Sequence, residues 1–221
     1  MNPPIAQCPS PNCGARRDGL APTLIVLHYT AMQSHEAALE RLCDAEAEVS
    51  AHYLISNTGS ITQLVPESER AWHAGPGEWA GQDDINSRSI GIELDNRGNH
   101  PFSEPQMCAL EGLLTDIMAR WTIPATGVIG HSDIAPMRKI DPGRHFDWAR
   151  LARQGLAGCG AKSETGECID ENSFITRAKS FGFTADVPLD SLLAATRLRF
   201  APWRQGPLTA ADMTLAHVFS D

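Results

Sequence analysis

The sequence predicts an α/β fold followed by a small helical domain. Short apolar runs, typical of buried strands, occur at residues 24–28 and 126–130. Residues 89–95 alternate as a strand does, and the segments between these strands carry apolar residues at helical spacing. From residue 173 onward the patterns are helical. The 221 residues suffice for one domain of ordinary size and a small second one.

The first elements are an extended segment, a strand and a helix. Residues 1–21 hold Pro, Cys, Gly and Arg without periodicity, so we expect an extended lead-in packed over the surface. Residues 24–28 form a continuous apolar run, which is typical of a strand covered on both faces. Residues 35–43 place apolar side chains on one side of a helix, and Ser34 precedes them as an N-cap.

A hairpin and a long loop follow. Residues 52–56 and 61–65 are strand-like and flank Asn57-Thr58-Gly59-Ser60, which predicts a hairpin. Residues 71–87 form a long loop rich in Gly and Asp. Because long structured loops in compact domains are usually functional, we expect this loop to line a cleft.

The strand at residues 89–95 has two distinct faces. Ile90, Ile92 and Leu94 fall on one face, and Gly91, Glu93 and Asp95 fall on the other. Glu93 therefore points away from the core, beside a glycine that leaves room for another molecule.

The remaining elements of the first domain are two helices and a strand. Residues 104–121 form the longest predicted helix, and Ser103 with Gln106 resembles a capping box at its start. Residues 126–130 form the last strand, and residues 146–154 a closing helix.

We divide the chain into three parts. Residues 1–156 form the first domain, and residues 157–172, rich in Gly, Glu and Lys, form a linker. Residues 173–221 form a small domain of three short helices, which we expect at residues 174–181, 189–199 and 209–219.

Charge and hydropathy exclude some classes of partner. The formal net charge of -9 argues against binding to nucleic acid. No apolar run approaches the ~18 residues of a membrane helix, so we expect no membrane insertion. The first residues lack the basic stretch followed by an apolar stretch that is typical of a signal peptide. The expectation is a cytoplasmic protein whose six cysteines are reduced, with a disulfide between Cys8 and Cys13 as the alternative.

Two histidines and a carboxylate indicate a metal site. His28 and His131 each end a short apolar run, and Asp141 lies in a loop stiffened by prolines. Two histidines and one carboxylate form the ligand set of catalytic zinc sites that keep one position open. A lone strand-end histidine is more often structural, and Asp141 before a proline also suits a turn.

Two further residues complete a hydrolytic mechanism. Glu93 suits a general base, and Lys139, two positions from Asp141, suits stabilisation of an oxyanion. The alternatives are an exposed carboxylate and a surface lysine paired with Asp133. His52 and His73 are also candidate ligands by composition, but His52 ranks lower because it begins a hairpin strand where a structural hydrogen bond is expected.

An ordered series of motifs across residues 20–156 resembles the zinc amidases called N-acetylmuramoyl-L-alanine amidases of the amidase-2 type. This group includes AmpD and AmiD amidases, phage amidase lysozymes and peptidoglycan recognition proteins. The motifs are His28-Tyr29-Thr30, residues 50–55, Ala71-Trp72-His73-Ala74-Gly75, Asn86 with residues 89–93, residues 130–136 and Lys139-Ile140-Asp141-Pro142-Gly143.

The resemblance implies a mixed central sheet with flanking helices. It also implies that His28, His131 and Asp141 bind Zn²⁺ and that Glu93 and Lys139 are catalytic. The implied substrate is a muropeptide or peptidoglycan, cleaved at the amide between N-acetylmuramic acid and L-alanine. By the same resemblance, loop residues Trp72, His73 and Asn86 face the substrate.

Several alternatives stay open. A cytosolic enzyme would act on 1,6-anhydro-muropeptides in cell-wall recycling, whereas an exported one would act on intact peptidoglycan. A muropeptide-binding module without activity is a further alternative, although all the implied site residues are present. The C-terminal helices resemble a peptidoglycan-binding-like domain or form a structural cap. Arg70, Arg88 and Arg97 are equal candidates for holding a peptide carboxylate.

Overall fold

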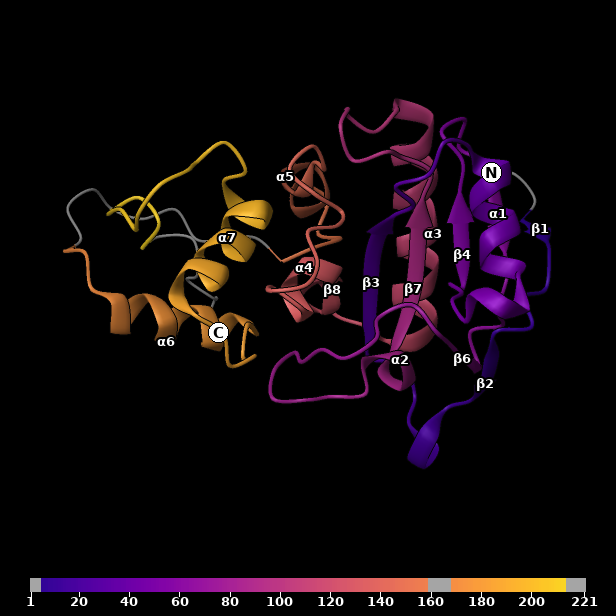
Figure 1. The fold of residues 1–221 in the computed structure, drawn as a ribbon, viewed down its shortest axis with the longest axis horizontal. Coiled ribbons are helices and arrows are strands. Elements are labelled where there is room, and N and C mark those ends of the chain that lie inside the picture. Colours follow the sequence, from indigo (N-terminus) through magenta and orange to yellow (C-terminus); the bar gives the residue numbers. More distant parts are fainter. Residues whose placement is uncertain (1–4, 159–167, 214–221) are drawn as a thin grey trace.

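The computed structural model describes residues 5–158 and 168–213 (Figure 1). The strands are β1 Ala6–Gln7, β2 Cys13–Ala15, β3 Leu24–Tyr29, β4 Tyr53–Ile55, β5 Ile61–Gln63, β6 Glu69–Ala71, β7 Ser89–Leu94 and β8 Val128–Gly130. The helices are α1 His35–Cys43, α2 Ile85–Arg88, α3 Glu104–Trp121, α4 His131–Ile134, α5 Trp148–Arg153, α6 Glu171–Phe181 and α7 Leu189–Phe200. Three turns of 3₁₀ helix lie at Arg17–Gly19, Ala45–Ala47 and Ala125–Gly127.

The central sheet is mixed, as the resemblance implied. Its six strands run in the order β1-β5-β4-β7-β3-β8. The β4–β5 hairpin is antiparallel, and the other four pairs are parallel. Because β3 pairs in parallel with both β7 and β8, the carboxyl ends of these three strands meet at one edge of the sheet. The register places His28 opposite Glu93.

One face of the sheet forms the main core. Alternate side chains of the strands, such as Ile25, Leu27 and Ile92, pack against α3 in one buried cluster. The expected division of β7 is therefore confirmed, because Ile90, Ile92 and Leu94 all belong to this cluster. His28, Gly91 and Glu93 consequently point to the opposite face.

The opposite face is covered at its two ends. Helix α1 packs Ala38 and Leu42 against Leu54 and its neighbours. At the other end, Val26 and Ile129 share a buried cluster with side chains of α6 and α7. Figure 1 shows α1 at the right and the C-terminal helices at the left, beyond α4 and α5. The middle of this face, between the two covers, holds the polar residues of β3 and β7.

The predicted helix starts are found, with one difference. Ser34 Oγ accepts a hydrogen bond from the Ala37 N–H, and Ser103 Oγ accepts one from the Gln106 N–H. The side chain of Gln106 does not complete a capping box, because its amide donates to the carbonyls of Ile55 and Asp95. It thereby ties α3 to the ends of β4 and β7.

The lead-in is more ordered than its composition indicates. Residues 6–7 and 13–15 form β1 and β2, which pair with β5 and β6. The pairing depends on strands more than fifty residues later in the chain, which local composition does not reveal. Cys8 and Cys13 are free thiols, and the sulfur near Cys8 Sγ is that of Cys43, 3.8 Å away.

Two expected segments fall partly outside the described residues. The predicted linker, 157–172, includes residues 159–167, and the third C-terminal helix, 209–219, includes residues 214–219. Within the predicted range of that helix, the described residues 210–213 form a turn. In the part of the chain that the structure describes, no helix is both long and apolar enough to span a bilayer.

Candidate metal centre

The three predicted ligands come together at the carboxyl edge of the sheet. His28 lies near the end of β3, His131 begins α4 directly after β8, and Asp141 lies on the loop that follows. The Ser132 N–H donates to the Asp141 carbonyl, which folds this loop back over α4. Because β3 and β8 are adjacent and parallel, their ends deliver both imidazoles to one point.

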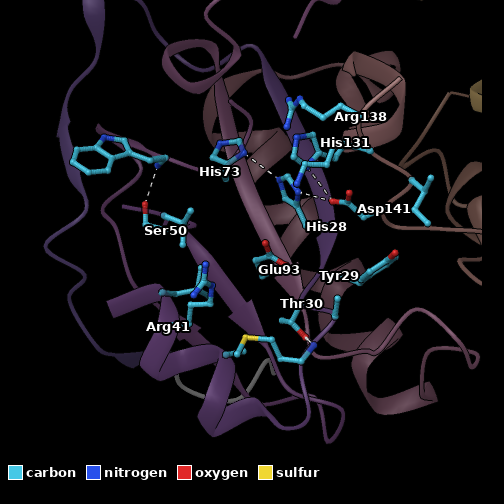
Figure 2. Close-up of a pocket in the computed structure, with 18 residues that line it drawn as sticks. His28, Tyr29, Thr30, Arg41, Ser50, His73, Glu93, His131, Arg138 and Asp141 are labelled. Carbon is cyan, nitrogen blue, oxygen red and sulfur yellow. Dashed lines mark hydrogen bonds and ion pairs between the residues drawn. The ribbon is translucent and has the colours of Figure 1, made fainter. Parts of the chain in front are cut away.

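The donor atoms converge closely. Asp141 Oδ2 lies 2.9 Å from His28 Nδ1 and 3.1 Å from His131 Nδ1. One ligand atom from each residue lies within 4.8 Å of the others. The three residues are 1%, 2% and 8% exposed, respectively for His28, His131 and Asp141. Figure 2 shows the three side chains pointing toward one another. The arrangement is a buried candidate metal site.

The chemistry of the donors fits a cation. His131 Nε2 lies 2.8 Å from the Ala74 carbonyl, which only accepts, so Nε2 carries a proton and Nδ1, on the side of Asp141, is the nitrogen that would bind a cation. Burial lowers the pKa of His28 to about 4. Burial alone raises the pKa of Asp141, but the contacts with His131 and His28 hold it well below its usual value. Neutral imidazole and ionised carboxylate are the forms that bind metal.

Glu93 lies beside this cluster, and one of its carboxylate oxygens, the buried Oε2, has no hydrogen-bond partner among the described residues. Burial, and then the charge of Asp141, raise the pKa of Glu93 to about 8, while Lys139 opposes them. An unpartnered buried carboxylate next to a candidate metal site is typical of a general base.

A cavity of about 400 Å³ opens over the cluster. Its walls include the three candidate ligands, Glu93, Lys139, Trp72 and His73, together with side chains of α1. All the predicted site residues except Asn86 thus line one cavity. The arginines lining it, in the described part of the chain, are Arg41 and Arg138 rather than Arg70, Arg88 or Arg97.

Asn86 lies behind the cavity wall. Its Oδ1 accepts hydrogen bonds from the main-chain N–H groups of His73 and Ala74, at 3.0 and 2.8 Å. The side chain is buried and holds the loop that carries His73. The contacts support a role in shaping the loop, and its expected contact with the substrate stays a prediction.

His52 has the structural role that its position in the hairpin predicts. Its Nδ1 accepts from the Gly91 N–H at 2.9 Å, and its Nε2 lies 3.1 Å from the Glu69 carbonyl. Both ring nitrogens are therefore used by the main chain. Burial lowers the pKa of His52 to about 3.

His73 fills the space beside Gly91. A Cβ at position 91 would lie 2.5 Å from Cγ of His73. The room that the glycine leaves is therefore occupied by this imidazole and not by another molecule. His73 Nδ1 lies 3.1 Å from His28 Nε2, and burial lowers the pKa of His73 well below its ordinary value.

Some contacts of the site have no signal in the sequence. Asp133 pairs with Arg199 of α7 at 2.8 Å, so the alternative that pairs it with Lys139 is wrong. Arg138 donates to the Ala74 carbonyl, the group that also accepts from His131. Both contacts join residues far apart in the chain, and only alignment of related sequences offers a signal for such pairs.

Comparisons with known proteins agree with this site. The family described as N-acetylmuramoyl-L-alanine amidase (Amidase_2) matches residues 18–144. The chain is 44% identical over 149 residues to N-acetylmuramoyl-L-alanine amidase AmiD of Escherichia coli, covering 60% of this chain and 53% of AmiD. It is 36% identical over 160 residues to 1,6-anhydro-N-acetylmuramyl-L-alanine amidase AmpD of E. coli, covering 65% and 87%.

Coverage of the relatives is uneven. An AmpD of Haemophilus influenzae is 44% identical over 106 residues, 48% of this chain and 58% of that protein. The chain therefore spans about half the length of this AmpD and of AmiD.

Solved structures share the fold over most of the chain. AmiD from E. coli, in complex with the substrate anhydro-N-acetylmuramic acid-L-Ala-D-γ-Glu-L-Lys, has a TM-score of 0.78 at 33% identity and covers 90% of this chain and 89% of its own. AmpDh3 from Pseudomonas aeruginosa, in complex with anhydromuramic pentapeptide, has a TM-score of 0.79 at 28% identity and covers 88% and 89%.

Proposed function

The chain belongs to the amidase-2 family of N-acetylmuramoyl-L-alanine amidases, and from this membership we propose that it hydrolyses the amide between N-acetylmuramic acid and L-alanine of a stem peptide. One observation carries the proposal. The buried cluster of His28, His131 and Asp141 lies beside the unpartnered carboxylate of Glu93, in one cavity. Metal-assisted hydrolysis requires a metal site with an adjacent general base.

We propose Zn²⁺ as the metal. Two neutral histidines and one carboxylate are the ligand set of catalytic zinc sites, in which a fourth position stays open. The chemistry that zinc supplies there is Lewis acidity, which lowers the pKa of water and polarises a carbonyl.

Glu93 is the proposed general base. It accepts the proton of the attacking water as the new C–O bond forms, and it returns the proton to the leaving nitrogen as the C–N bond breaks. Its position opposite His28 in the β3–β7 register places it next to the ligand cluster. Lys139 and a cation in the site both favour the ionised form of Glu93, which is the form that accepts a proton.

Lys139 is the proposed stabiliser of the oxyanion. It lines the cavity two positions from Asp141, and its ammonium is the kind of donor that a developing negative charge requires. Trp72 lines the same cavity and is a proposed contact for the substrate, together with the predicted residues His73 and Asn86.

The proposed substrate is a 1,6-anhydro-muropeptide, cleaved in the cytosol during cell-wall recycling. Support for the anhydro sugar comes from the names of the AmpD relatives and from the ligands in the AmiD and AmpDh3 complexes. An envelope enzyme that acts on intact peptidoglycan is the alternative, because AmiD is as similar in sequence, at 44% identity, as the AmpD of H. influenzae is.

The first experiment is a digest followed by mass spectrometry. Zinc-loaded protein is incubated with purified 1,6-anhydro-muropeptides and, separately, with intact peptidoglycan sacculi. Release of free stem peptide from the anhydro fragments alone is the expected result. Efficient cleavage of sacculi would replace the recycling role with an envelope role, and release from neither would contradict the amidase activity.

A further inference from the structure

We propose that His73 is a positioning residue for the metal ligand His28. A chain of hydrogen bonds from the Ile85 carbonyl through Ser89 and His73 places the proton of His28 on Nε2, which leaves Nδ1 free to bind metal. The inference rests on the proposed metal site and extends it to residues that do not touch the ion.

The direction of the chain is set at its far end. A carbonyl oxygen only accepts, so Ser89 Oγ, 2.6 Å from the Ile85 carbonyl, must donate its single proton there. Ser89 Oγ is then left with lone pairs. It lies 3.2 Å from His73 Nε2, so His73 Nε2 must carry a proton and donate it to Ser89.

The same reasoning carries through to the ligand. A neutral His73 with its proton on Nε2 has a lone pair on Nδ1. His28 Nε2 lies 3.1 Å from this lone pair and therefore donates to it. His28 Nδ1 is then the nitrogen available to a cation, and Asp141 Oδ2 lies 2.9 Å from it. If Ser89 donated to His73 instead, each proton in the chain would shift and Nδ1 of His28 would be blocked.

The two histidine ligands reach the same state by different means. His131 donates directly to the Ala74 carbonyl, so its tautomer follows from one contact. For His28, the Ile85 carbonyl acts through two intervening side chains. A partner on the far nitrogen is how metal-binding histidines are generally oriented, and the structure assigns that function to His73 in the case of His28.

His73 is held in place by its surroundings. The Asn86 amide oxygen fixes its main chain, and the absence of a side chain at Gly91 lets the ring lie flat against β7. The half-buried ring lies beside His28 and His52, with centroid distances of 5.2 and 5.8 Å. A ring held so closely keeps one orientation, which a directional relay requires.

The test uses variants that break the relay at different points. Ser89→Ala removes the acceptor for His73, and His73→Leu removes the acceptor for His28. His73→Asn keeps an oxygen near the position of Nδ1 and serves as the conservative variant. Ser56→Ala is the matched control, because Ser56 is also a buried serine that makes hydrogen bonds, but in the β4–β5 turn.

Two readouts are independent of turnover. In the zinc-loaded protein, ¹⁵N NMR of the imidazoles is expected to show the proton of His73 on Nε2 in the wild type and Ser56→Ala, and a mixture of tautomers in Ser89→Ala. Zinc affinity, measured by competition with a chelator, is expected to fall about 10–100-fold in Ser89→Ala and His73→Leu. His73→Asn should recover most of this loss.

The outcomes separate the relay from the activity. A proton on Nδ1 of His73 in the zinc-loaded wild type, or unchanged zinc affinity in both Ser89→Ala and His73→Leu, would overturn the relay. If His73 only contacted the substrate, His73→Leu would raise KM and leave zinc affinity unchanged. If the wild type shows the expected tautomer and affinity but cleaves no muropeptide, the proposed activity fails while the relay stands.

Discussion

At the scale of single residues, Glu93 and Asp141 are two carboxylates of one site with opposite surroundings. Asp141 contacts two imidazoles, which keep it ionised, whereas Glu93 Oε2 has no partner among the described residues. Two carboxyl groups whose pKa values are shifted in opposite directions are suited to different tasks. The first is suited to hold a metal and the second to transfer a proton.

This difference predicts how substitutions at the two positions act. Glu93→Gln is expected to keep its zinc and to lose about 10²–10⁴-fold in kcat, because only proton transfer is removed. Asp141→Ala is expected to lose the zinc itself. Zinc content by atomic absorption and turnover of a muropeptide measure the two effects.

The control is Glu40→Gln, which changes an exposed carboxylate on α1 and is expected to affect neither quantity. Near-normal turnover in Glu93→Gln would assign the base to another residue.

At the scale of secondary-structure elements, His52 joins β7 to the start of β6. Its Nδ1 accepts from the main chain of Gly91, and its Nε2 lies close to the Glu69 carbonyl. Burial holds the pKa of His52 at about 3, below the ordinary value of 6.5. The unfolded chain therefore binds this proton more tightly than the folded protein does.

The link between these elements thus predicts a pH dependence of stability. The contribution of neutral His52 is complete above the unfolded pKa and is lost as the pH falls below it. Between pH ~7.5 and ~5.5, the stability advantage of the wild type over His52→Asn should shrink by about 1.4 kcal/mol. Chemical denaturation at each pH measures it, with His145→Asn, an exposed site, as the control. Parallel pH profiles for wild type and His52→Asn would contradict the assignment.

At the scale of the whole molecule, the C-terminal helices complete the core of the catalytic part. Phe174, Phe181 and Leu192 share one buried cluster with Val26 and Ile129 of the sheet. The Arg199–Asp133 pair crosses the same boundary, with side chains 0% and 1% exposed. Asp133 also accepts from the Gly130 N–H at the start of α4, the helix that carries His131. For the C-terminal helices, the sequence left two roles open, a structural cap and substrate binding. These contacts support the structural cap.

Breaking this boundary is expected to destabilise the entire fold. Arg199→Met leaves the buried Asp133 without its partner and should cost about 3–5 kcal/mol of unfolding free energy. Arg204→Met is the control, because Arg204 is partly exposed and lies 3.6 Å from Asp212, and it should cost less than about 1 kcal/mol. Deletion of the residues after Gly158 should give an insoluble product. A stable, soluble truncated protein with weaker substrate affinity would favour the binding role instead.

Much of the local structure is determined by the sequence itself. The apolar run of β3, the alternation of β7 and the cap residues Ser34 and Ser103 each act through neighbours in the chain, so their elements are predictable. The residue types His, His and Asp, at strand ends and in a Pro-rich loop, likewise indicate a metal site because ligand chemistry restricts the choice.

The tertiary structure alone decided how those parts work together. His28 lies opposite Glu93 because of the β3–β7 register. His73 fills the space at Gly91 because its loop returns to the sheet. The Arg199–Asp133 pair joins residues 66 positions apart, and β1 pairs with β5, whose partner residues follow more than fifty positions later. Such contacts arise from packing of distant segments, whose partners no local pattern specifies. Local sequence patterns therefore specify the ligands and their elements, whereas packing sets their register, their hydrogen-bond partners and the place of the C-terminal helices.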